Sequence, residues 1–431
     1  MKYYNLWSPA LIAGLLFFST IMKRLFSAYL KTFDGLSREV WWLALITLIN
    51  RAGAMVIPFL SLYLTDDLNF TLSNVGWVMT CFGLGSLFGA WLGGKLSDII
   101  GYYKVILFSL IGTGLGFFAL QYITSFWGIC LGFFTLIAIA DSSRPAFFVA
   151  LSAYSKPENK TRSLTLIRLA INLGFSAGPA VGGLIIGGIG YFGLFWVDGI
   201  TCILAGLLLI KTLHPKKARV TDKEEMIEKP LSPYSDRMYI IFLIALALFG
   251  FVFVQYFSTI PLYYKEIHGL QEQQIGLLLG LNGFLIFVFE MPLIAFLESK
   301  NWSQVGNVIT CLLLVGLSFL LFLITPWAGI LVIGMTVATL GEMIAFPFGN
   351  AFALRRAKLG RQGAYMGLYS MSFSLSHIFG HNSGMQLVAA LGYNSTWIVM
   401  IFVTGIAFLL LYYVRRKVKS ETSASNVSLS K

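Results

Sequence analysis

Residues 94–104, with the sequence GKLSDIIGYYK, separate two apolar runs at residues 73–96 and 104–122. Each run is long enough to cross a bilayer, which takes about 20 mostly apolar residues. A charged connection this short, with Gly94 and Gly101 near its ends, predicts a hairpin that brings both runs into antiparallel contact. The stretch therefore indicates a helical membrane protein and sets the orientation of its neighbours.

The composition of the whole chain agrees with this interpretation. Of its 431 residues, 57% are hydrophobic and only 12% are charged. Such a chain has too little polar surface for a soluble globule, so we expect an all-α, multi-pass membrane protein. Twelve apolar segments are predicted to cross the bilayer: residues 41–64, 73–96, 104–122, 125–152, 163–187, 191–212, 238–264, 273–297, 304–323, 327–350, 363–387 and 393–414.

The basic residues predict the topology. The net charge is +12, and most of the 31 Lys and Arg lie before the first span, on alternate loops or in the C-terminal tail. Loops rich in Lys and Arg stay in the cytoplasm, whereas the loop with Asp66 and Asp67 belongs outside. Both termini are thus expected in the cytoplasm. The positive charge indicates anionic lipid headgroups as partners and not nucleic acid.

The chain also resembles itself at an offset of about 202 residues. Pro58 aligns with Pro261, Pro145 with Pro347, and Gly178 with Gly380. Matches at one offset, in register with the spans, predict two six-helix halves related by duplication. The expected organisation is an N-terminal extension at 1–40, which can form an interfacial helix, halves at 41–212 and 238–416, a cytoplasmic linker at 213–237 and a polar tail at 417–431.

Two motifs resemble those of the major facilitator superfamily. In the opening hairpin Gly94, Leu96, Asp98, Gly101 and Lys104 match, while Tyr102 and Tyr103 replace expected basic residues. The fifth span contains the run GFSAGPAVGG at residues 174–183, which resembles the signature of proton-coupled antiporters in that superfamily through the residues Gly174, Gly178, Pro179 and Gly182. The resemblance implies a twelve-helix monomer in the bacterial inner membrane, with substrate bound near the midplane and export favoured over uptake. It also implies that Asp98 acts as a conformational latch; a solvated turn is the alternative.

Charged residues within the spans are the candidate functional groups. Each costs about 2.5–3.5 kcal/mol at mid-helix on insertion scales, so such residues are rarely without purpose. For proton coupling we expect Glu342 or Glu290, with Asp141 third. The substrate cavity is expected to include Asn50, Arg51, Arg144, Arg168 and His377. Ion pairs between first-half arginines and second-half carboxylates are expected to hold one access state closed.

Simpler structural roles compete with these assignments. Arg168 lies about five residues into its span and can extend to the cytoplasmic surface. Asp141 and Arg144 are three residues apart and can neutralise each other. His377 can be a packed, hydrogen-bonded residue, although His381 lies four positions later on the same face and leaves a role in proton transfer open.

Other chemical classes have little support in the sequence. The run from Gly174 to Gly178 also fits the G-x-S-x-G pattern of serine hydrolases, but that pattern needs a strand-to-helix turn. The four cysteines lie inside spans without a C-x-x-C pair, so neither a disulfide nor a metal site is expected. The leading hypothesis is secondary export of small, hydrophobic or amphipathic compounds, driven by protons without a cofactor. The alternative is proton-linked uptake of a sugar, peptide or organic anion.

Overall fold

The computed structural model describes residues 35–156, 159–216, 232–300, 302–324, 327–357 and 362–429. Within these ranges eleven helical segments are long and apolar enough to cross a membrane. Residues 1–34 of the expected extension and 217–231 of the expected linker lie outside the described residues.

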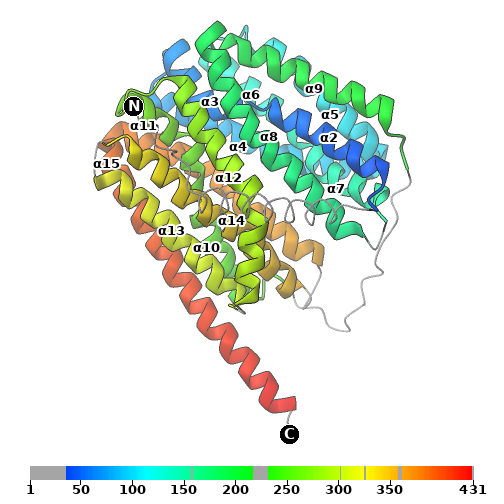
Figure 1. Ribbon diagram of the computed structural model, residues 1–431, viewed down its shortest axis with the longest axis vertical. Helices are drawn as coiled ribbons and strands as arrows, with labels where there is room; N and C mark the ends of the chain where they lie inside the picture. Colours follow the sequence, from blue (N-terminus) through cyan, green and yellow to red (C-terminus); the bar gives the residue numbers. More distant parts are fainter. Residues whose placement is uncertain are drawn as a thin grey trace, which may run out of the picture.

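The helices form two sets in the same order along the chain. In Figure 1 the labels α2, α5, α7 and α9 lie on one side of the molecule, and α10, α13 and α14 on the other. The first set comprises α2 (Arg38–Ala52), α3 (Val56–Leu62), the π-helix η1 (Tyr63–Asp67), α4 (Leu72–Ile100), α5 (Tyr102–Leu120), α6 (Phe126–Asp141), α7 (Ser143–Tyr154), α8 (Lys160–Ile189) and α9 (Phe192–Thr212). The second comprises α10 (Arg237–Phe253), the 3-10 helix η3 (Val254–Phe257), α11 (Thr259–Glu266), α12 (Glu272–Ser299), α13 (Gln304–Ile324), α14 (Gly329–Ala357) and α15 (Gln362–Leu429).

The two sets share their irregular positions. The first span breaks between α2 and α3, and the corresponding span of the second set breaks at η3. Gly190, with φ 80° and ψ −179°, separates α8 from α9. Gly392, 202 residues later, interrupts α15 with nearly the same angles, φ 76° and ψ 175°. The apolar part of α15, Tyr365–Lys419, has 55 residues. A continuous helix of that length would measure about 80 Å, far more than one bilayer crossing needs, and the non-helical angles of Gly392 instead divide α15 into two helices.

The structure corrects the opening hairpin. Residues 94–100 belong to α4 and residues 102–104 to α5, so the expected loop consists of Gly101 alone. Its φ of +86° lies in the region that favours glycine, which lets one residue reverse the chain. A side chain at Gly94 would meet nothing within 4 Å. The backbones approach closely where α4 crosses α6 instead, at Gly85 and Gly89, where an added Cβ would overlap backbone carbonyls.

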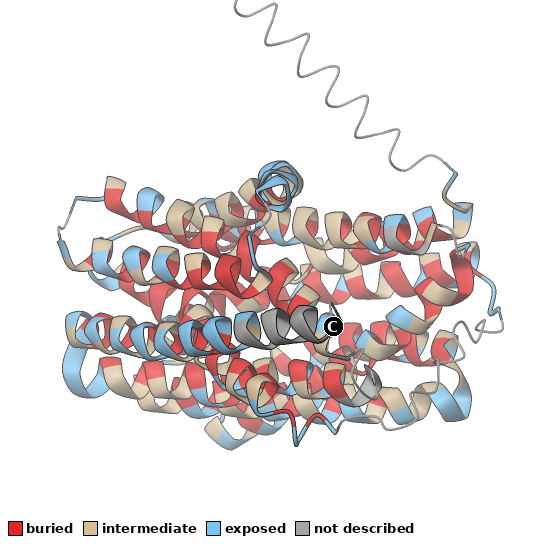
Figure 2. Cartoon of the chain, turned by 90° about the horizontal axis from the view of Figure 1, so that it is seen from below, coloured by how far each residue is buried: buried red, intermediate tan, exposed pale blue. Residues whose placement is uncertain are grey.

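The sets meet along two pairs of helices. On one side α8 packs against α12, and on the other α4 packs against the first part of α15. Figure 2 shows buried residues where helices face one another, and exposed residues mostly on the outer faces. Many exposed side chains are large and apolar, including Trp127, Leu131 and Phe402. An apolar outer surface of this kind suits a helical bundle surrounded by lipid.

Candidate functional site: a cavity between the two sets of helices

A cavity of about 300 Å³ lies between the two sets of helices. This is at the lower end of the range for small-molecule sites. Much of its wall is aromatic, and both sets contribute to it: Phe82 and Phe175 from the first, and Phe253, Tyr256, Phe257 and Phe346 from the second. Such rings provide a large apolar surface for a ligand, and their faces also attract cations.

Arg51 and Arg144 line the cavity from the first set, as expected from the sequence. Arg144 forms an ion pair with Asp141, with 2.7 Å between Nε and Oδ1, and Ser86 donates a second hydrogen bond to that carboxylate. Arg51 instead places its guanidinium carbon 5.6 Å from the centre of the Phe175 ring. Asp141 is therefore shared between a serine and an arginine, while Arg51 has an aromatic ring as its neighbour.

Glu342 of α14 lines the cavity from the second set. The side-chain amide of Asn282 donates to its Oε2 at 2.8 Å, and also to the Thr339 hydroxyl at 3.0 Å. Among the described residues, neither Arg51 nor Glu342 forms an ion pair. One cation and one carboxylate of this cavity thus remain without an opposite charge in direct contact.

Glu290 is also buried, but it is engaged elsewhere. It pairs with Arg168, and the Asn172 amide donates to its other oxygen at 3.1 Å. Both partners lie on α8 and Glu290 lies on α12, so this cluster joins the two sets of helices. Arg168 therefore pairs with a carboxylate of the other set, the kind of ion pair that the sequence led us to expect, but it does not line the cavity in which it was expected. Of this cluster, only Asn172 lines the cavity.

His377 and His381 both line the cavity from α15. His377 Nδ1 lies 3.1 Å from His381 Nε2, so the two rings share a hydrogen bond along one helix face. Asn50 lines a second cavity of about 70 Å³, which Arg51 and Arg144 border as well. The Asn50 amide lies 3.4 Å from the Cys202 sulfur.

The glycine run of α8 packs this helix against the first span. A Cβ at Gly174 would approach the Arg51 Cβ to 2.5 Å, and one at Gly182 would lie 3.1 Å from the Phe59 ring. Gly178 lies near the Ala52 carbonyl, and Pro179 lines the cavity. The Ser176 hydroxyl donates to the Gly280 carbonyl at 3.0 Å in the middle of the helix. The G-x-S-x-G match is therefore a helix contact and not a nucleophile elbow.

Asp98 and Lys104 lie at the facing ends of α4 and α5, and both are exposed. Among the described residues, Asp98 forms no hydrogen bond or ion pair that would join it to another helix. The latch assigned to Asp98 thus stays a prediction.

Asp198 is a buried charge that the sequence analysis overlooked. Its carboxylate is fully buried on α9 and accepts hydrogen bonds from the backbone N–H groups of Met55, at 3.0 Å, and Val56, at 2.9 Å. These are donors that the break between α2 and α3 leaves free. The only signal was an acidic residue in the middle of the predicted span 191–212.

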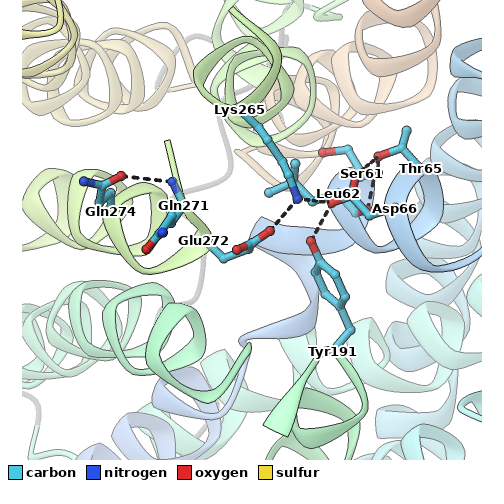
Figure 3. Close-up of polar contacts among 9 residues, drawn as sticks. All are labelled: Ser61, Leu62, Thr65, Asp66, Tyr191, Lys265, Gln271, Glu272 and Gln274. Atoms are coloured by element: carbon cyan, nitrogen blue, oxygen red, sulfur yellow. Dashed lines mark hydrogen bonds and ion pairs between the residues drawn. The ribbon is translucent and has the colours of Figure 1, made fainter. Parts of the chain in front are cut away.

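A second overlooked group closes one end of the molecule. Lys265 of α11 contacts Asp66 of η1 at 2.6 Å and also pairs with Glu272 of α12. The Tyr191 hydroxyl donates to the same Asp66 oxygen at 2.8 Å. Figure 3 shows these four side chains converging between the two sets of helices. We call Asp66, Tyr191, Lys265 and Glu272 the end cluster.

Two sets of membrane helices around a cavity with polar and aromatic walls define a membrane transporter. The sequence model of the Major Facilitator Superfamily matches residues 41–381 and 307–430, and the chain belongs to this family. It is a multi-pass integral membrane protein, and its family is one of transporters and not of enzymes.

Relatives and solved structures agree with this assignment. The chain is 26% identical to an uncharacterized MFS-type transporter, YqjV, of Bacillus subtilis over 91% of this chain and 97% of the relative. It is 22% identical to a Na⁺, Li⁺, K⁺/H⁺ antiporter of Planococcus maritimus (86% and 94%), and 25% identical to the quinolone resistance protein NorA of Staphylococcus aureus (78% and 86%). The crystal structure of a peptide transporter in complex with sulfate shares the fold, with a TM-score of 0.75 at 16% identity over 90% of this chain and 95% of that one.

Proposed function

We propose that this protein exports small amphipathic organic compounds in exchange for protons by alternating access. The observation that carries the proposal is the cavity between the two sets of helices, with aromatic walls and the carboxyl group of Glu342. A relative named for quinolone resistance and another named as a proton antiporter support this direction of transport. Hard cations such as Ca²⁺ and Mg²⁺ prefer six or more oxygen ligands, whereas most side chains of this wall are apolar.

The proposal includes twelve spans, with both termini on the cytoplasmic side of the bacterial plasma membrane. The break at Gly392 supports two spans within α15, because Gly190 separates α8 from α9 at the matching position. The excess of Lys and Arg on alternate loops supports the orientation. With this orientation, the end cluster lies on the outer side.

This conformation is closed at the outer end. Lys265 bridges to Asp66 there, and the Gln386 amide of α15 donates to the Ser73 hydroxyl of α4 at 2.9 Å. Deeper in the membrane, the Ser61 hydroxyl donates to the Ser258 carbonyl at 3.0 Å. Transport requires that these contacts between the sets separate when the outer end opens.

Glu342 is proposed to carry the proton. Its carboxyl group borders the cavity and, within the described part of the chain, has the neutral Asn282 as its one hydrogen-bond partner, so protonation breaks no ion pair there. Glu290 is the second candidate, because protonation would release Arg168 and loosen the contact between α8 and α12. Asp141 is the third, since Arg144 and Ser86 already engage both of its oxygens.

The test is transport in proteoliposomes with an imposed pH gradient. Compounds are first screened by thermal shift on purified protein, and each hit is then assayed for substrate-dependent proton movement. The proposal expects proton uptake in exchange for exported substrate. A substrate current in the same direction as the protons would support uptake instead, and substrate-independent proton flow would contradict both.

A further inference from the structure

The charged groups that border the cavity are distributed unevenly. On the first-set wall, Arg51, Arg144 and Asp141 together leave one positive charge, since Asp141 already pairs with Arg144. On the second-set wall Glu342 adds one negative charge. The Arg168–Glu290 pair is neutral as a unit. The cavity therefore has a positive wall facing a negative wall, with aromatic rings between them.

Charges held apart from water are costly unless an opposite charge meets them. Among the residues that the structure describes, half-buried Arg51 contacts the face of Phe175 and pairs with no carboxylate, and Glu342 accepts a hydrogen bond from the Asn282 amide and pairs with no cation. Each therefore keeps donors or acceptors for a ligand. A guanidinium binds a carboxylate through two parallel hydrogen bonds, and a carboxylate binds an ammonium group through short, charge-assisted ones.

We infer that the substrates are zwitterions with an aromatic body, whose anionic group binds Arg51 and whose ammonium group binds Glu342. This inference rests on the proposed function and names its substrate class. A simple organic cation would satisfy Glu342 but leave Arg51 and the positive wall unpaired. A simple organic anion would leave Glu342 unpaired. Only a ligand with both charges compensates both walls.

Binding of the ammonium group to Glu342 also links substrate binding to proton transport. The ammonium group of the ligand and the incoming proton compete for the Glu342 carboxyl group, so one leaves as the other arrives. A zwitterion carries no net charge, and exchanging one for one proton moves one positive charge inward. A membrane potential of 100 mV then contributes about 2.3 kcal/mol per cycle.

The experiment uses a matched set of four ligands with the purified full-length chain. The parent probe is 4′-(aminomethyl)biphenyl-4-carboxylic acid, and 4-(aminomethyl)benzoic acid provides a shorter separation of charge. For each, the methyl ester keeps only the amine, the N-acetyl derivative keeps only the carboxylate, and the doubly blocked compound keeps neither. Affinities are measured by isothermal titration calorimetry.

For at least one of the two lengths, blocking either charge is expected to weaken binding to the wild-type protein about tenfold, or 1.4 kcal/mol. In Arg51→Gln the parent and the ester should bind equally, while N-acetylation still costs about tenfold. In Glu342→Gln the parent and the N-acetyl derivative should bind equally, while esterification still costs about tenfold. Arg51→Lys keeps the charge and should keep the preference for the carboxylate. Binding of the ester by Arg51→Gln at the wild-type affinity shows that the variant is folded.

The inference is overturned if wild-type protein binds all four forms of both probes equally, or if Arg51→Gln still discriminates against the ester. Loss of all binding by both Arg51→Gln and Arg51→Lys also counts against it, because lysine keeps a positive charge for the carboxylate although it lacks the paired donors of arginine. Proton exchange with other compounds, but without zwitterion binding, leaves the proposed function standing and removes this inference. Charge-dependent binding without any proton movement supports the zwitterion as ligand and removes the proposed proton exchange.

Discussion

Asp66→Asn should open the outer end of the protein, because it removes the charge that Lys265 reaches from the other set of helices. Within the end cluster, Tyr191 and Asp66 both belong to the first set, while Lys265 and Glu272 both belong to the second. Those two contacts can survive opening. The pair between Lys265 and Asp66 joins the two sets and must break, as must the Gln386–Ser73 and Ser61–Ser258 contacts, so it is one of several contacts that favour the closed state.

The geometry sets the size of the effect. Both side chains of this pair are 31% exposed, which places the pair between a surface and a buried ion pair. Exposed pairs contribute roughly 0.2–1 kcal/mol, and partial burial favours the upper end of that range, about 1 kcal/mol. The ratio of outward-open to outward-closed molecules should therefore rise about fivefold in Asp66→Asn.

The assay is labelling of a cysteine placed in the cavity. The four native cysteines are replaced, Ile286 becomes cysteine, and a membrane-impermeant maleimide is applied from outside. The labelling rate should rise about fivefold in Asp66→Asn. Thr65→Val is the matched control, since the hydrogen bonds of the Thr65 hydroxyl to Ser61, Leu62 and Asp66 all lie within the first set, and its rate should stay near that of the parent. An unchanged rate in Asp66→Asn, or an equal rise in both variants, would refute the reasoning.

Three further predictions concern helix contacts. Gly183→Ala should impair transport because its Cβ would lie 2.5 Å from the Glu272 carbonyl, whereas Gly188→Ala, with nothing within 4 Å, should transport normally in the same vesicle assay. Asp198→Ala should lower the free energy of unfolding by about 2 kcal/mol, because two buried backbone donors lose their acceptor. Thermal unfolding measures this loss, and an unchanged midpoint would contradict the prediction. Arg168→Glu and Glu290→Arg should each reduce transport, and the double variant should recover part of it; no recovery would argue against the pair.

The sequence was sufficient to predict the helical membrane fold and its family. Spans follow from runs of about 20 apolar residues, which depend on composition and not on tertiary contacts. The repeat was visible too, because Gly178 and Gly380 keep matching positions in the two sets. The length of the loop at 94–104 was overestimated because its polar residues suggested an irregular connection. Helices can extend beyond the apolar core, and these residues belong to the ends of α4 and α5. Only Gly101, with its positive φ, forms the turn.

The site was predicted less completely. Arg51, Arg144 and His377, which were expected in a substrate cavity, border the cavity between the two sets, whereas Arg168 and Asn50 do not. Glu342, which was expected to carry the proton, borders it too, because charged residues in spans face the interior. The choice of partner was not predictable: sequence cannot tell that Glu290 pairs with Arg168 while Arg51 contacts an aromatic ring. That choice depends on how α8 crosses α12.

Asp198 was missed for a related reason. Its partners are backbone groups of Met55 and Val56, and these become free only where the first span breaks. The end cluster was missed because its four members come from η1, α11, α12 and the turn before α9, which only the packed structure brings together.

The most direct test of the account is the number of protons exchanged per substrate molecule in proteoliposomes that contain wild-type protein or Glu342→Gln. This ratio does not depend on how tightly either protein binds its substrate. The account predicts one proton per substrate for the wild-type protein, and substrate movement without proton movement for Glu342→Gln. An unchanged ratio in Glu342→Gln would contradict the assignment of the proton to this carboxyl group.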